Sequence, residues 1–93
     1  MKEGKLTYTV VLTREQDGRY SVFVPALDGC FTWGKTVPHA LQMAEEAIQL
    51  YLEVLQEDGE PIPRDTRRVS FDMATATEAL VYKLTVREAA TVA

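Results

Sequence analysis

The segment from residue 20 to residue 63 constrains the fold most, because strand runs, turn glycines and one capped helix follow one another in it without a linker. Thr36 supplies the hydroxyl of an N-cap, and Pro38 stands in the first helical turn, where a missing amide hydrogen costs little. We expect the helix to end at Asp58 and Gly59, and two prolines follow soon after. One helix of this length can cover one face of a small sheet.

Apolar residues recur in this helix at spacings of three and four, which predicts a buried stripe and a polar side. The residues predicted to face inward are Val37, Ala40, Leu41, Ala44, Ala47, Ile48, Tyr51, Val54 and Leu55. Those predicted to face outward are His39, Gln42, Glu46, Gln49, Glu53 and Gln56.

Alternating polar and apolar residues predict strands before the helix. Residues 5–13 alternate and indicate a half-buried strand, and residues 19–25 resume an extended pattern after a polar break that ends in Gly18. The two segments are expected to form an antiparallel hairpin. A short third strand is predicted for residues 30–34, after the turn at Asp28 and Gly29.

The region after the helix is more ambiguous. Residues 67–73 alternate and suggest a fourth strand. Residues 79–86 also alternate, but Thr75 and Glu78 have the spacing of a capping box that could open a helix. We favour a strand, since β-branched and aromatic residues are frequent there. The sequence therefore predicts an α+β fold of order β-β-β-α-β with an extra C-terminal strand.

Length and composition limit the class of protein. The chain has 93 residues, enough for one core, so we expect a single domain over residues 1–93. Its net charge of −4 disfavours direct binding to nucleic acid and suits a basic protein partner. No apolar run is long enough to span a membrane, and we expect a cytoplasmic location. Cys30 is the single cysteine, so no intrachain disulfide can form.

Residues with catalytic chemistry are few and scattered. His39 has no carboxylate or nucleophile at a paired spacing, and we expect it to lie on the surface. Asp17 and Asp28 each adjoin a turn glycine, where aspartate is favoured for local hydrogen bonds. We therefore predict a protein that is not an enzyme, with no catalytic residue, no metal site and no cofactor.

Two groups of residues are candidates for contact with another protein. By strand parity, Phe23 and Trp33 share the sheet face that a single helix leaves uncovered. Alternatively, the C-terminal segment folds over them. Glu46 and Glu53 belong to the acidic side of the helix and are candidate contacts for a basic partner.

Self-association is also expected, because short strands leave edges that must be paired or protected. The apolar alternation of the last predicted strand makes it the best candidate for pairing across subunits of a homo-oligomer. The residues proposed for this contact are Leu80, Tyr82 and Leu84.

The ordered motifs resemble those of the HicB antitoxin family. The matching positions are Val24, Pro25, Leu27, Gly29, Cys30, Gly34, Thr36, Ala40, Leu41, Ala44, Glu46, Ala47, Ile48, Leu50, Tyr51, Leu52, Glu53, Asp58, Gly59, Glu60, Pro61 and Pro63. The resemblance implies a partial ribonuclease H-like domain without an active site. It also implies binding to a small RNA-cleaving toxin, HicA, whose activity is blocked when its surface is occupied.

This chain departs from the family pattern at two places. Residues 75–93 are too few for the C-terminal DNA-binding module of many HicB proteins, so direct repression of transcription is not expected. Lys35 and residues 37–39 stand where acidic residues are common, which removes negative charge from the helix start. The alternative hypothesis is therefore an orphan domain that self-assembles or binds a ligand and has no toxin partner.

Overall fold

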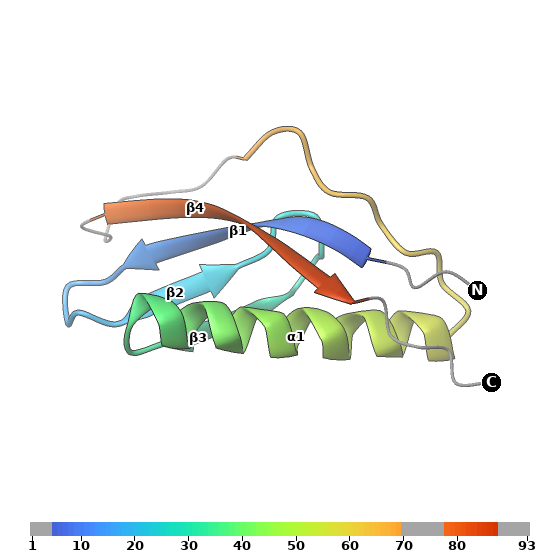
Figure 1. The fold of residues 1–93 in the computed structure, drawn as a ribbon, viewed down its shortest axis with the longest axis horizontal. Helices are drawn as coiled ribbons and strands as arrows, with labels where there is room; N and C mark the ends of the chain where they lie inside the picture. The colour runs from blue at the N-terminus through green and yellow to red at the C-terminus, as the bar shows by residue number, and fades with distance from the viewer. Residues whose placement is uncertain (1–4, 70–77, 88–93) are drawn as a thin grey trace.

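A computed structural model of the chain describes residues 5–69 and 78–87 (Figure 1). One helix lies against an antiparallel sheet of four strands, in the order β-β-β-α-β. The predicted α+β class is confirmed. The elements are β1 (Lys5–Arg14), β2 (Tyr20–Phe23), β3 (Phe31–Gly34), α1 (Val37–Glu57) and β4 (Glu78–Arg87).

The strands lie in the spatial order β3-β2-β1-β4, so that β3 and β4 form the two edges. The predicted hairpin joins β1 to β2, and its turn contains Gly18 with a φ of 93°. The last segment is a strand, as favoured from the sequence, and pairs with β1 along ten residues. By contrast, β2 pairs only with Val11–Arg14, so no strand among residues 5–69 and 78–87 lies beside the first half of β1 on that side.

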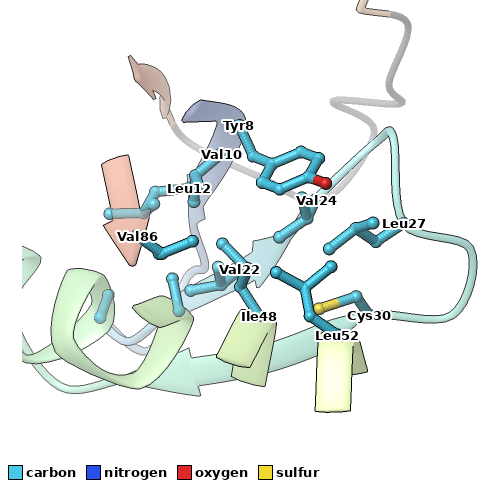
Figure 2. Packing of buried hydrophobic residues seen from close by; sticks show 12 residues of the cluster. Tyr8, Val10, Leu12, Val22, Val24, Leu27, Cys30, Ile48, Leu52 and Val86 are labelled. Carbon is cyan, nitrogen blue, oxygen red and sulfur yellow. The ribbon is translucent and has the colours of Figure 1, made fainter. Parts of the chain in front are cut away.

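The core lies between the sheet and α1, and Figure 2 shows side chains from both layers converging there. The helix contributes a row of buried residues at a spacing of four, which includes Ile48 and Leu52. The expectation that Val54 faces inward is wrong, because Val54 is exposed and Leu52, which was not assigned to the stripe, is completely buried. The fully buried row is thus narrower than the predicted stripe: Ala40, Ala44, Ile48 and Leu52.

The predicted helix ends are confirmed. Thr36 has extended backbone angles, and its hydroxyl oxygen accepts a hydrogen bond of 3.2 Å from the backbone N–H of His39. At the other end the N–H of Asp58 donates to the carbonyl of Val54, and Gly59 takes a φ of 72°. The left-handed conformation of Gly59 is one that residues with a Cβ rarely adopt.

Two expectations for the strands need correction. Residues 67–69 are not in a strand, and the remaining residues of the fourth predicted strand, 70–73, lie outside the described residues. The central part of β1 is also not half-buried. Thr9, Val11 and Thr13, on the face opposite α1, are all buried.

The segment that follows α1 runs back along the sheet (Figure 1). Polar contacts attach it to β1 and β4. The Tyr8 hydroxyl donates to the carbonyl of Pro63 at 2.6 Å. The Asp65 carboxylate accepts hydrogen bonds of 2.8 Å from the backbone N–H and the hydroxyl of Thr9, and forms an ion pair of 2.8 Å with Lys83. Asp65 therefore satisfies a β1 amide that lies beyond the end of β2.

Candidate partner-binding surface

The residues considered for catalysis do not come together in the structure. His39 lies at the start of α1, where its Nδ1 accepts a hydrogen bond of 3.0 Å from the backbone N–H of Lys35. Asp17 binds Arg19 within the β1–β2 turn, and Asp28 is exposed in the turn before β3. Within residues 5–69 and 78–87, no group of three His, Cys, Asp or Glu side chains is placed to hold a metal ion.

The seven candidate interface residues lie on three different surfaces. Phe23 and Trp33 are on the sheet face opposite α1, because the register places Phe23 beside Val11 and Trp33 beside Ser21. Glu46 and Glu53 are exposed on α1. The other three are half-buried on the helix side of β4 and border the core: Leu80, Tyr82 and Leu84.

Trp33 is exposed, yet its ring is flanked on two sides. The guanidinium of Arg19 lies 5.2 Å from the ring centroid, and the Asp17 carboxylate holds this guanidinium at 2.8 Å. The ring of His39 meets Trp33 edge-on with a centroid distance of 6.3 Å. Cation–π and edge-to-face contacts both favour one ring position. An exposed aromatic residue held in this way loses little freedom when it contacts a partner.

Phe31 extends the aromatic surface and was not singled out from the sequence. It lies directly opposite Phe23 in the β2–β3 pair, and their ring centroids are 6.4 Å apart. Its side chain is 71% exposed, the largest fraction among the exposed large apolar residues of the described chain. The signal was available, because Phe31 and Trp33 are two residues apart in one strand and must share a face.

An open apolar groove of about 470 Å³ runs between the start of β3 and the second half of α1. Leu50 and Val54 line its helix side and are 62% and 47% exposed. Phe31 and Cys30 line the opposite side. Burial raises the pKa of the Cys30 thiol, so this sulfur is a poor nucleophile and serves as an apolar wall. The groove therefore offers apolar contact area to another molecule.

The charges on α1 are all of one sign. The helix carries Glu45, Glu46, Glu53 and Glu57 and contains no lysine or arginine. Glu46, Glu53 and Glu57 lie three or four residues from Leu50 or Val54, which places them beside the apolar groove residues on the helix surface. The apolar groove thus has an acidic margin, a combination that favours a basic partner with apolar side chains.

The sequence matches one family model over residues 8–88, described as a HicB-like antitoxin of bacterial toxin–antitoxin systems. A UPF0150 protein of Thermoplasma acidophilum is 53% identical over 60 residues, which cover 64% of this chain and 87% of that protein. A UPF0150 protein of Synechocystis is 45% identical over 58 residues, covering 62% of this chain and 73% of the relative.

Solved structures share the fold at low sequence identity. The N-terminal domain of the Burkholderia pseudomallei antitoxin HicB superposes with a TM-score of 0.63 at 22% identity, covering 85% of this chain and 95% of that domain. A chain of a toxin–antitoxin complex from Streptococcus pneumoniae superposes with a TM-score of 0.77 at 19% identity, covering 89% of this chain and 69% of that chain. Within the described residues, no helix is long and apolar enough to cross a membrane.

Proposed function

The chain belongs to the HicB-like antitoxin family, and from this premise we propose that it neutralises a small RNA-cleaving toxin of the HicA type by direct protein contact. In this proposal the chain acts in the cytoplasm, where the toxin meets RNA. It carries out no catalysis of its own and needs no metal or cofactor. Inhibition follows because the bound chain occupies the surface through which the toxin reaches its RNA.

The observation that carries the proposal is the family match, which extends over residues 8–88 and so includes every strand and the helix at least in part. The surface chemistry agrees with it. An RNA-cleaving protein needs basic residues to bind phosphates, and α1 presents only acidic ones. Opposite charge accelerates association and selects against acidic partners.

The proposal predicts that a small basic reading frame adjoins the gene, and a growth experiment with that frame tests it. Induction of that frame alone is expected to arrest growth, and co-expression of this chain is expected to restore it and to yield a complex on copurification. Gly34→Val, whose side chain would clash with Ala40 and is expected to prevent folding, serves as a control and should not restore growth. Arrest that persists when the folded chain is present in excess would contradict the proposal, and so would the absence of any adjoining toxin frame.

A second candidate function is a self-assembling domain without a toxin, and the edge strand β4 favours it. Its helix-facing residues Leu80, Tyr82 and Leu84 remain half-buried at the border of the core. Pairing of two copies of β4 would extend the sheet across subunits and cover these side chains, although Lys83 in the middle of β4 opposes it. Sedimentation over a range of concentrations tests this assembly, and a monomer at tens of micromolar would exclude it.

A further inference from the structure

We propose that the free edge of β3 and the groove beside it bind an extended, basic strand of the toxin, which adds to the sheet as a fifth strand. This inference rests on the proposed function and names the surface through which it acts. Strand addition combines backbone hydrogen bonds along a sheet edge with pockets for alternate side chains. Both requirements are met beside β3.

The backbone of β3 has one set of hydrogen-bonding groups directed to the open edge. The N–H of Val24 donates to the carbonyl of Cys30 at 3.2 Å, one residue beyond the Phe23–Phe31 pair that ends the β2–β3 ladder, and this bond marks which pairs of the ladder are hydrogen-bonded. Hydrogen-bonded pairs alternate along an antiparallel ladder. The backbone groups of Phe31 and Trp33 therefore point away from β2, and β3 is the last strand on that side of the sheet in the described part of the chain.

The side chains at this edge are apolar and accessible. Phe31 and Trp33 carry the outward backbone groups and are also 71% and 46% exposed. Next to Phe31 lies the groove, whose helix side presents Leu50 and Val54. An incoming strand can thus bond to the β3 backbone while every second side chain enters the groove.

The charge beside the groove decides between a toxin strand and a second copy of this chain. Two copies joined at β3 by a two-fold axis would bring two α1 helices near each other, and each carries Glu46, Glu53 and Glu57 beside its groove residues. Like charges placed together oppose association. In a partner strand that alternates apolar residues with lysine or arginine, the apolar side chains can enter the groove while the basic ones pair with the glutamates.

Amide hydrogen exchange measured by NMR tests the contact directly, with a catalytically inactive form of the toxin from the adjoining frame. In the free chain the amides of Phe31 and Trp33 are expected to exchange rapidly, whereas those of Thr32 and Gly34 are protected by β2. Added toxin should slow exchange at Phe31 and Trp33. Protection of these two amides that grows with the concentration of the chain alone would assign the edge to a second copy and overturn the inference.

Substitutions in the groove test the apolar contact. The double variant Leu50→Gln with Val54→Gln keeps good helix formers at exposed positions and is expected to weaken toxin binding by about tenfold or more. Val81→Gln is the matched control, because Val81 is 54% exposed on the other edge strand, and its affinity should stay within about twofold of the wild type. Isothermal titration calorimetry measures both.

A proline substitution at Trp33 distinguishes the contribution of the backbone N–H to binding from that of the side chain. Trp33→Pro removes an outward N–H without removing a β2–β3 hydrogen bond, whereas Trp33→Thr loses the ring and keeps the N–H. We expect the proline variant to bind the toxin several-fold more weakly than the threonine variant. Thermal unfolding of both variants verifies that each is folded.

The two proposals fail in different ways. If the toxin binds, but the amides of Phe31 and Trp33 are unchanged and the Leu50/Val54 variant binds as tightly as the Val81 control, the β3 assignment is wrong and the antitoxin function stands. If the chain does not bind the toxin at all, the antitoxin function is wrong and the β3 assignment falls with it.

Discussion

The two edge strands of the sheet are secured in different ways. β4 pairs with β1 over ten residues, and polar groups reinforce it: Thr85 hydrogen-bonds to Thr7 at 2.8 Å, and Lys83 is paired with Asp65. β3 has only four residues and no charged side chain. Its last residue, Gly34, is pressed against the start of α1.

This contrast indicates which edge is suited to a partner. A lysine on an edge strand discourages pairing with another chain, and Lys83 stands in the middle of β4. The sequence FTWG of β3 has no such protection. Since α1 packs against β3 from one side, the outer edge of β3 can pair with another strand while the core residues keep their packing. This division, with β4 closed and β3 open to a partner, can be tested by substitutions on both sides of it.

The division requires that the groove residues do not support the fold. Leu52 is completely buried, whereas Leu50 is largely exposed in the groove. Leu52→Ala should lower the free energy of unfolding by about 3 to 4 kcal/mol, because it leaves a cavity. Leu50→Ala should change it by less than about 0.5 kcal/mol. Urea denaturation measures both, and equal losses would show that the groove is part of the core.

The junction of β3 with α1 is the next point to test. A Cβ added to Gly34 would lie 2.5 Å from the Cα of Ala40, too close for any residue but glycine. Gly34→Ala is expected to cost about 2 to 3 kcal/mol through overpacking. Gly18→Ala is the control, since a Cβ there meets open space and only the positive φ opposes it, at about 1 kcal/mol. A Gly34→Ala protein as stable as the wild type would remove the claim that α1 supports β3.

Local patterns were sufficient for most of the fold. The N-cap at Thr36, the turn at Gly18 and the helix end at Gly59 depend on neighbouring residues, and each was predicted. The assignment of Val54 to the core was wrong because residues 51, 52, 54 and 55 are all apolar. The sequence therefore does not show which of them lies at the centre of the buried stripe. Only contact with the sheet selects Leu52 instead. The interface expected at Phe23 and Trp33 depends on a second chain, so it stays a prediction.

Asp65 holds β4 in place through its ion pair with Lys83, and this role was not predicted from the sequence. Asp65→Ala leaves the buried backbone N–H of Thr9 without its acceptor and should cost about 2 kcal/mol. Asp17→Ala is the matched control: it also removes an aspartate from an ion pair, but an exposed one, and should give no measurable change. Chemical denaturation distinguishes them. Equal effects would mean that β4 is not secured by this contact.

Nothing local signals the contact of Asp65, because its partners are 56 and 18 residues away in the chain. The groove was missed for a related reason. Leu50 and Val54 lie between glutamates on the helix, and sequence alone does not tell whether such a pair is covered. In the structure the pair lines an open groove opposite Cys30 and Phe31, far along the chain from both. Tertiary geometry thus supplies the parts of the site that periodicity does not.

The smallest change is expected when acid protonates Asp65 and so weakens its contribution to the free energy of unfolding. Burial raises the pKa of the Asp65 carboxyl, but hydrogen bonds from Lys83 and Thr9 outweigh it and hold the pKa below the ordinary value of 3.8. A carboxyl whose pKa is lower in the folded chain stabilises it fully above the unfolded pKa, and this contribution is lost as the pH falls through the folded pKa.

Asp65→Asn isolates this contribution, since the amide keeps an acceptor for Thr9 and does not titrate. The difference in unfolding free energy between wild type and Asp65→Asn should be largest at neutral pH and shrink below pH 3.8. The lowered pKa of Asp17 acts in both proteins and cancels. Urea denaturation across this range measures the difference. A difference that stays constant in acid would show that the charge on Asp65 contributes nothing, and that β4 is secured by hydrogen-bond geometry alone.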